Sequence, residues 1–403
     1  MVVTQGWQPR LAWPLQGARP AATMAAMTTL PYDSWPPSRL QNALVEAGLR
    51  PGQAHRAVTM LGHALWREFL PWDQALAKIG GAAGPKVAEL CAAPTHLEVM
   101  ADERSVDGSH KLLFRTADGE VIESVLIPAD SGKRTTLCVS SQVGCGRRCA
   151  FCQTGRLGLV RNLTTGEIVA QLRLTQQLWA SQRGEQPLIT NVVFMGMGEP
   201  LDNLDHVADA VAVMTDDLGA GLSWRRVTVS TVGVAWKLPE FFAKVQANLA
   251  LSLNAPDDQR RSWLMPINER CGMTELKAAL LQHLPQGRDV LVEYVLMAGV
   301  NDATADADLL IAWMQGLAVR VNLIPANAGP VPALRAPDRE AIQAFQKYLL
   351  DRGVRTMVRW SHGGDLGGAC GQLAGEVREM LRRGERVPVG GLVGLRRATA
   401  AAA

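Results

Sequence analysis

Residues 135–152 read TTLCVSSQVGCGRRCAFC, a β-rich run that ends in three closely spaced cysteines. This run begins a series of short apolar segments, and amphipathic, helix-like segments such as residues 166–182 separate them. Strands that alternate with helices at this interval predict an α/β fold with a parallel sheet and right-handed crossovers. The six to seven units are too few for a closed eight-fold barrel. We therefore predict an open, partial (β/α)6-type barrel whose working end lies at the carboxyl ends of the strands. The predicted strands are residues 135–141, 189–195, 226–231, 249–254, 290–297, 319–325 and 354–360.

Two smaller regions precede the barrel. Residues 31–95 carry apolar side chains at helical spacing, with Pro and Gly between the runs, and predict a helical accessory domain. Residues 96–134 alternate between apolar and polar side chains around an Ala117–Gly119 corner, which predicts a β-hairpin extension. The barrel and a C-terminal loop that contains Cys370 then occupy residues 135–383.

Both ends of the chain are predicted to be tails. Residues 1–30 contain Arg but no acidic residue and no continuous apolar segment, which excludes a signal peptide. A transit peptide and a mis-assigned start both remain open for this segment, because Met24 and Met27 follow closely. Residues 384–403, which contain arginines and a run of alanines, are predicted to be disordered.

The composition excludes several classes of protein. Of the 403 residues 47% are hydrophobic, and the net charge is +3 at pH 7, so the chain can bury a core. It lacks a run of about 18 apolar residues, so we expect no membrane span and no membrane partner. Seven cysteines, an odd number, indicate a reducing cytoplasm rather than a secreted disulfide framework. The small positive charge permits a nucleic-acid partner without predicting one, and we expect a monomer.

Cys145, Cys149 and Cys152 form a CxxxCxxC motif directly after the first barrel strand. Zinc sites usually take four ligands in two pairs, and no second CxxC or CxxH pair follows. Three thiolates favour a [4Fe–4S] cluster in which one iron stays open for the amino and carboxylate groups of S-adenosylmethionine (SAM). A zinc site or a redox thiol site is the alternative.

Small and polar residues follow the later strands. FMGMGEP (194–200) would form a turn whose backbone meets the ammonium group of SAM. Ser230, Ser252–Asn254 and Asn327 follow other strands. Each alone is more typical of a helix cap or an ordinary loop. Because the carboxyl ends of parallel strands meet at one mouth, we predict that together they form a ring of ligands.

The motifs resemble those of the radical SAM RNA adenine methyltransferases of the RlmN/Cfr type. The resemblance covers the chain from about residue 95 to 380, with the motifs in order. ACGQLAGEV (369–377) discriminates best, because a cysteine triad is shared by most radical SAM enzymes. The other matching stretches are TLCVSSQVGC (136–145), FMGMGEP, RRVTVSTVG (225–233), INER (267–270), VEYVLM with VND (292–302) and VNLIP followed by Asn327.

The resemblance implies a role for each matching position. The three clustered cysteines would bind the [4Fe–4S] cluster. Cys370 would be methylated by a first SAM and carry the carbon, and Cys138 would resolve the covalent enzyme–RNA adduct. Glu123 would be the base that removes the C2 proton. The implied SAM contacts are Gly198, Glu199, Ser230, Ser252, Leu253, Asn254 and Asn327.

The implied reaction suits these residues. C2 of adenine is electrophilic, so a direct attack on the SAM methyl group fails. A carbon radical on the methylated Cys370 can add to C2, Glu123 can remove the proton, and a Cys138–Cys370 disulfide can form as the carbon leaves. The resemblance also implies an RNA substrate, which is 23S ribosomal RNA alone or together with tRNA, and an electron donor such as flavodoxin.

Other interpretations stay open. Methylation at adenine C8, or an RNA-binding protein with a structural cluster, would use the same triad. Within a strand, Cys138 is typical of a core cysteine and Glu123 of a solvated face. Asn254 stands where the family usually has His, and residues 361–368 carry less Arg and Asp than is usual, so the RNA target is open. Candidates for a basic RNA-binding surface are Arg225, Arg226, Arg355 and Arg359.

Overall fold

The computed structural model describes residues 29–129, 132–182 and 188–373. The predicted tails lie almost wholly outside these residues, as does the end of the 369–377 motif. Among the described residues, no helix is long and apolar enough to cross a membrane.

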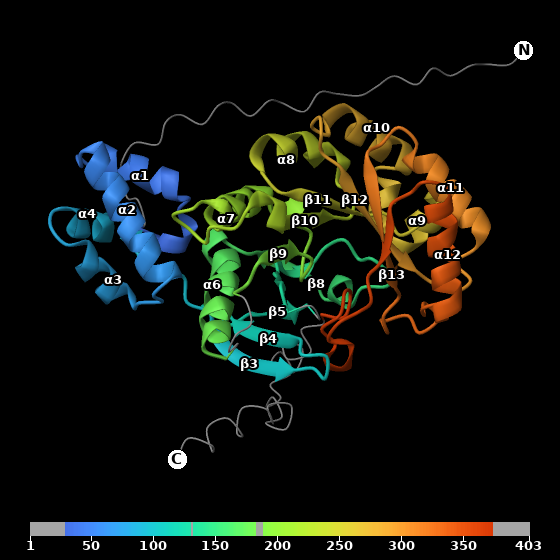
Figure 1. The fold of residues 1–403 in the computed structure, drawn as a ribbon, viewed down its shortest axis with the longest axis horizontal. Coiled ribbons are helices and arrows are strands. Elements are labelled where there is room, and N and C mark those ends of the chain that lie inside the picture. Colours follow the sequence, from blue (N-terminus) through green and yellow to red (C-terminus); the bar gives the residue numbers. More distant parts are fainter. Residues whose placement is uncertain (1–28, 130–131, 183–187, 374–403) are drawn as a thin grey trace, which may run out of the picture.

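The N-terminal region is a bundle of four helices beside the barrel (Figure 1). Proline occupies the first turn of two of them, where its missing N–H costs nothing and its fixed φ suits a helix. Asp33 joins this region to the barrel, because its buried carboxylate accepts hydrogen bonds from Thr95 and lies 3.7 Å from Arg173. The helices are α1 (Pro37–Glu46), α2 (Pro51–Trp66), α3 (Trp72–Ile79) and α4 (Ala83–Leu90).

The barrel is built on a single ten-stranded sheet in the order β14-β13-β12-β11-β10-β9-β6-β5-β4-β3. The strands from β6 to β14 in this order pair in parallel, which agrees with the predicted open barrel. These parallel strands are β6 (Thr135–Cys138), β9 (Asn191–Phe194), β10 (Val227–Thr231), β11 (Asn248–Ser252), β12 (Val290–Leu296), β13 (Val319–Pro325) and β14 (Thr356–Val358).

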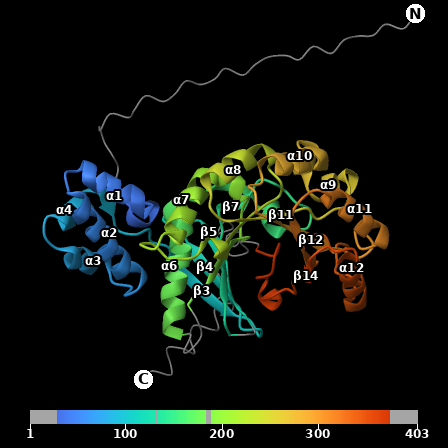
Figure 2. The same cartoon turned by 45° about the horizontal axis from the view of Figure 1, so that its top comes forward.

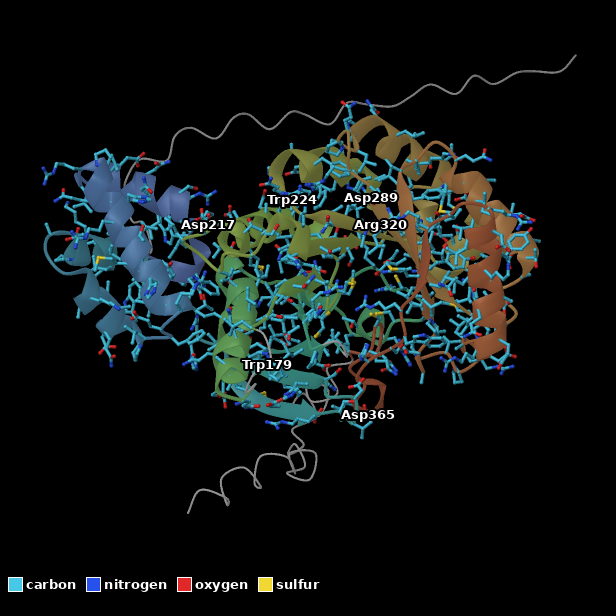
Figure 3. The ribbon with its side chains drawn as sticks, viewed as in Figure 1. Trp179, Asp217, Trp224, Asp289, Arg320 and Asp365 are labelled. Carbon is cyan, nitrogen blue, oxygen red and sulfur yellow. The ribbon has the colours of Figure 1, made fainter. Side chains whose placement is uncertain are left out.

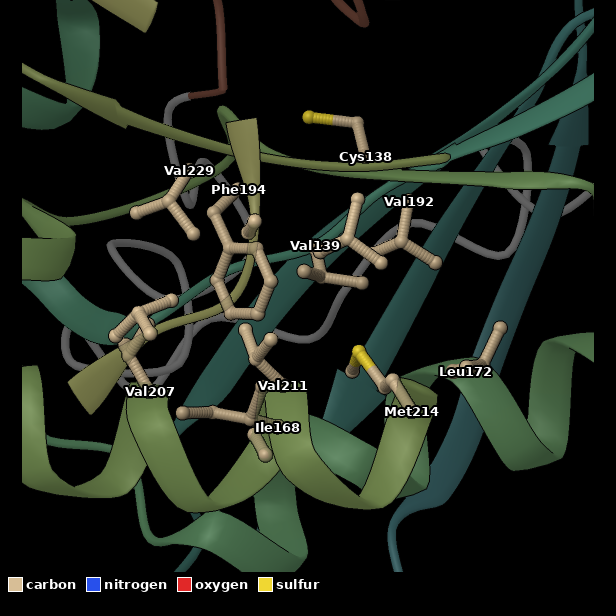
Figure 4. Packing of buried hydrophobic residues seen from close by; sticks show 14 of the residues in the cluster. Cys138, Val139, Ile168, Leu172, Val192, Phe194, Val207, Val211, Met214 and Val229 are labelled. Atoms are coloured by element: carbon tan, nitrogen blue, oxygen red, sulfur yellow. The ribbon is translucent and has the colours of Figure 1, made fainter. Parts of the chain in front are cut away.

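Helices cover the outer face of the parallel strands, and Figure 2 shows them as an arc around the sheet. In Figure 4, Ile168 and Met214 on two of these helices pack with Phe194 of β9, and Cys138 points to the other side of the strand layer. The inner face of the barrel therefore receives Cys138. The outer helices are α6 (Thr165–Gln182), α7 (Leu204–Thr215), α8 (Leu238–Lys244), α9 (Asp258–Leu264), α10 (Met273–His283), α11 (Thr304–Met314) and α12 (Arg339–Asp351).

Residues 98–128 extend the sheet with three antiparallel strands, β3 (Glu98–Arg104), β4 (His110–Arg115) and β5 (Val121–Pro128). The predicted Ala117–Gly119 corner is the turn between β4 and β5. β5 pairs antiparallel with β6, so the segment is continuous with the barrel sheet. This pairing covers an edge of the parallel sheet that would otherwise expose unpaired backbone groups.

Candidate active site

The three clustered cysteines lie on a loop at the carboxyl ends of the parallel strands. Cys145 ends the short strand β7 (Gln142–Cys145), and Cys152 precedes the helix α5 (Gln153–Arg156). All three cysteines line one pocket of about 130 Å³. Phe151, which precedes the third cysteine, lines it too. The predicted ligand set is therefore gathered at one place.

Burial governs the chemistry of these thiols. It raises the pKa of Cys145 to about 12 and holds the pKa of Cys149 well above its usual value. The negative charge of Cys152 raises both pKa values further. Thiolates form in such a site when a bound cationic centre stabilises them. The donor set of the pocket thus fits an iron–sulfur cluster.

The placement of the thiols does not suit a single metal ion. Within the described residues, no three His, Cys, Asp or Glu side chains come close enough together to hold one ion. Ligands of separate irons in a cluster need not converge on one point, whereas the ligands of zinc must. A cluster held by Cys145, Cys149 and Cys152 stays a prediction.

The glycine turn after β9 packs directly on the cysteine loop. Gly198 has φ +106°, and a Cβ there would lie 2.7 Å from the side chain of Gln142. Glycine is required because it alone accepts this conformation and this close approach. The Gln142 side-chain oxygen accepts a hydrogen bond from the backbone N–H of Glu199 at 2.8 Å, which fixes the turn against β7.

Glu199 presents a buried carboxylate to the pocket. Its two oxygens accept hydrogen bonds from the backbone N–H groups of Leu201 (3.0 Å) and Val232 (2.8 Å). Burial raises the pKa of Glu199 to about 7, and these hydrogen bonds oppose the rise. A cationic ligand in the pocket would favour the ionised form, so Glu199 fits a contact to the SAM ammonium group.

Most of the predicted SAM contacts line this pocket, but one does not. Leu253 is fully buried, and its backbone N–H and C=O bond to Glu293 and Arg261, respectively. Asn254 lines the pocket in a left-handed conformation (φ +59°), which Asn tolerates better than most residues. The predicted contacts that line the pocket are Gly198, Glu199, Ser230, Ser252, Asn254 and Asn327.

A second, smaller cavity of about 30 Å³ brings Cys138 and Cys370 together. Cys370 also lines the cluster pocket, and the Asn327 side chain donates a hydrogen bond to its carbonyl oxygen at 3.0 Å. Arg359 lines the small cavity and lies 3.6 Å from Glu293. Burial raises the pKa of both thiols, and the Arg359 guanidinium opposes that rise. Arg359 therefore favours the thiolate forms of the pair.

Glu123 lies in β5 on the same sheet but does not line either cavity. Its side chain is 2% exposed and is 3.6 Å from the ammonium group of Lys111. Glu123 is thus a buried, ion-paired carboxylate rather than a solvated face residue.

A third cavity, of about 700 Å³, opens between the amino ends of the strands. Trp224 lies at its rim between Arg225, 4.4 Å away, and Arg288, 3.9 Å away. Figure 3 shows Trp224 close to Asp289 and Arg320, which form a two-pronged ion pair. Of the four arginines predicted for a basic surface, Arg225 and Arg359 line this cavity, whereas Arg226 and Arg355 do not.

Comparison with known proteins identifies the family. Residues 139–310 match the Radical SAM superfamily. The chain is 52% identical over 309 residues to a probable RNA methyltransferase of Sorangium cellulosum, covering 76% of this chain and 77% of that protein. It is 45% identical over 289 residues to the dual-specificity RNA methyltransferase RlmN of Geotalea uraniireducens, covering 72% of this chain and 81% of that protein. The chain belongs to the RlmN-type family of radical SAM RNA methyltransferases.

A solved structure agrees with this family. The crystal structure of a radical SAM methyltransferase from Sphaerobacter thermophilus superposes with a TM-score of 0.76 at 37% identity. The match covers 85% of this chain and 99% of that one. The predicted family, the α/β partial-barrel fold and the enzyme class are therefore confirmed. Membership of the radical SAM superfamily implies a [4Fe–4S] cluster and SAM, while the roles of individual residues stay predictions.

Sequence reasoning missed several polar residues of the site. Arg359 was expected on a basic surface, but it also reaches the two thiols. Glu293 lines the cluster pocket from the middle of β12. Lys111, the ion-pair partner of Glu123, was not singled out. Glu293 could have been found from the sequence, because a carboxylate in the middle of an otherwise apolar strand is unusual. Nothing in the sequence around Lys111 marks it, apart from its place in a predicted strand.

Proposed function

We propose that this enzyme methylates C2 of an adenine in 23S ribosomal RNA, with tRNA as a second substrate, through a covalent enzyme–RNA adduct. The shared cavity of Cys138 and Cys370, beside the cluster pocket, carries the proposal. A structural cluster needs neither thiol, and neither does a direct transfer of the SAM methyl group. The RlmN relatives, which are named as dual-specificity RNA methyltransferases, support the choice of substrate.

The chain's own residues divide the work of the reaction. When bound, the cluster and SAM supply the methyl group and the radical chemistry that makes its carbon reactive. Cys370 carries this carbon on its sulfur and delivers it to C2, and Glu123 accepts the C2 proton. The Cys138 thiolate then attacks the Cys370 sulfur, so an S–S bond forms while the S–C bond breaks. The departing carbon keeps the bonding electron pair and takes up a proton to become the methyl group.

The redox balance requires partners. The radical adduct releases one electron when it returns to a closed-shell state. A carrier such as flavodoxin supplies or accepts electrons one at a time during the reaction. Two further electrons from an external reductant return the Cys138–Cys370 disulfide to thiols. Arg359 assists this exchange, because its positive charge favours the attacking thiolate.

The wide cavity at the amino ends offers a path for the RNA. It shares Met195 and Glu293 with the cluster pocket, and Met195 and Arg359 with the thiol cavity, so it leads toward Cys370. Guanidinium groups at the rim of this cavity are suited to contact RNA phosphates. An adenine that is flipped out of the base stack of the RNA would enter the cavity.

Nucleoside mass spectrometry tests the product. The wild-type chain and a Cys370→Ala variant are expressed in a host that lacks its own enzyme of this kind, and 23S ribosomal RNA and tRNA are digested separately. We expect 2-methyladenosine in both fractions with the wild type and in neither with the variant. A signal for 8-methyladenosine would contradict the choice of C2, and methylation of neither RNA would contradict the choice of substrate.

A further inference from the structure

The loop that carries Cys370 is held by the turn between β3 and β4. The Asp365 carboxylate accepts hydrogen bonds from the Ser105 hydroxyl at 2.6 Å and from the backbone N–H of Val106 at 3.3 Å. The Asp107 carboxylate accepts one from the backbone N–H of Gly363 at 2.8 Å. Figure 3 shows Asp365 beside the tip of this hairpin. Two segments about 260 residues apart in sequence are thus joined.

Lys111 connects this loop to Glu123. Its ammonium group donates a hydrogen bond to the Leu366 carbonyl oxygen at 3.1 Å and lies 3.6 Å from a Glu123 carboxylate oxygen. It also lies 3.9 Å from Glu103. The Lys111 side chain is 13% exposed and that of Glu123 is 2% exposed. An ion pair so far from solvent has a defined geometry, because little water competes for either charge.

The register of the strands explains why these groups meet. β4 and β5 pair so that Lys111 lies opposite Val125 and Leu113 lies opposite Glu123. Lys111 and Glu123 are diagonal neighbours on one face of the sheet, a separation that a long side chain can span.

We propose that Lys111 is a positioning residue for the reaction. Its ammonium group contacts both the Glu123 carboxylate and the Leu366 carbonyl at one end of the Cys370 loop. It therefore fixes the position of the proton acceptor Glu123 relative to the carbon carrier Cys370. The inference rests on the proposed roles of Glu123 and Cys370.

The backbone of the loop shows why a tether is needed. Gly363, Gly367 and Gly371 all have positive φ, a region that only glycine enters readily. The far end of the loop is fixed separately, because the Gly371 carbonyl accepts a hydrogen bond from the backbone N–H of Gln153 at 2.8 Å. Without Lys111, the segment between these anchors gains conformations in which Cys370 is misplaced.

The test compares Lys111→Met and Lys111→Arg in the full-length, cluster-loaded enzyme under anaerobic conditions. Lys347→Met, on the outer helix α12, is the matched control because its side chain is 75% exposed. We expect Lys111→Met to lower kcat about tenfold, which corresponds to about 1.4 kcal/mol, with the KM for RNA nearly unchanged. Lys111→Arg should restore much of the rate, and iron content should not change.

Alkylation of Cys370, followed peptide by peptide by mass spectrometry, separates a positioning role from a general loss of activity. Lys111→Met should raise the rate at which N-ethylmaleimide modifies Cys370 several-fold, since the loop opens more often. Wild-type kcat together with wild-type alkylation would overturn the proposal. The control variant should match the wild type in both measurements.

Two further variants keep the outcome clear. Lys111→Met leaves the buried charge of Glu123 unpaired, and the variant could lose its cluster for that reason alone. In that case Lys111→Met is combined with Glu123→Gln, which removes the charge. Faster Cys370 alkylation in this double variant than in Glu123→Gln alone supports the tether, and equal rates refute it. Cys138→Ala is examined in parallel for an RNA adduct. If that variant forms no adduct, the proposed function fails on its own account, whatever Lys111 does.

Discussion

The two ends of the open barrel differ in size and in charge. The pocket at the carboxyl ends has a volume of about 130 Å³ and is lined by four thiols, the clustered three and Cys370, and by the buried carboxylates of Glu199 and Glu293. The cavity at the amino ends is about 700 Å³ and has Arg225 and Arg288 at its rim. Reactive groups are thus withdrawn from solvent at one end, while positive charge faces solvent at the other.

The reactive groups and the guanidinium groups proposed to contact RNA thus lie at opposite ends of the strands. Burial at the carboxyl ends raises the pKa of every clustered thiol, so thiolates form there only when a bound cationic centre stabilises them. At the amino ends, burial and the charge of Arg225 lower the pKa of Arg288, and both guanidinium groups lie over the Trp224 ring. Arg359 stands where the two regions meet, 3.3 Å from the Met195 sulfur. Variants at each end should therefore fail in different ways.

The largest effect is expected from the cluster cysteines. The wild type should bind about four iron atoms per chain. Changing Cys145, Cys149 or Cys152 to Ala should abolish iron binding and all RNA methylation. Iron analysis and the broad visible absorbance of the anaerobically purified protein measure the loss. Cys91→Ala is the control, since Cys91 is a buried cysteine that lies in the N-terminal region, outside the cluster pocket. Zinc bound at full occupancy by the wild type would contradict the assignment.

The next effect separates the two remaining thiols, which share one cavity but have different proposed roles. Cys138→Ala keeps the carbon carrier and loses the resolving thiol, so the protein should accumulate covalently bound to RNA. Cys370→Ala has no carrier and should never form this adduct. Denaturing gels with and without nuclease show the adduct as a nuclease-sensitive slow band. Such a band in the Cys370 variant, or in neither variant, would refute the roles while leaving the cluster intact.

The sequence predicted the two ends unequally well. The strands and the cysteine loop follow from local patterns, and β12 begins at the predicted residue. Leu253 was placed among the SAM contacts, but it directly follows β11 and is buried outside the pocket, whereas Ser252 and Asn254 on either side of it line the pocket. The hydrogen bond between Ser105 and Asp365 was beyond prediction, because no periodicity relates residues so far apart. The rim around Trp224 was only partly foreseen for the same reason, since Arg225 precedes β10 whereas Arg288 precedes β12, 63 residues later.

The smallest effect should come from the rim of the wide cavity. The double variant Arg225→Gln/Arg288→Gln removes both positive charges that contact Trp224 and leaves the cluster pocket untouched. If each guanidinium binds one phosphate, affinity for RNA should fall roughly 10- to 100-fold at low salt, and the slope of log K against log salt should decrease by about 1 to 2.

This prediction can be checked by filter binding or fluorescence anisotropy across a salt series, with iron content as a measure of the intact cluster end. The control is Lys347→Gln/Arg352→Gln on and just after α12, which removes two exposed positive charges from the outside of the barrel. General attraction of RNA to a positive protein would weaken binding equally in both double variants, because each loses the same charge. Specific phosphate contacts at the rim would lower affinity and salt slope only in the Arg225/Arg288 variant. An unchanged salt slope in that variant would mean that RNA reaches the thiols by another route.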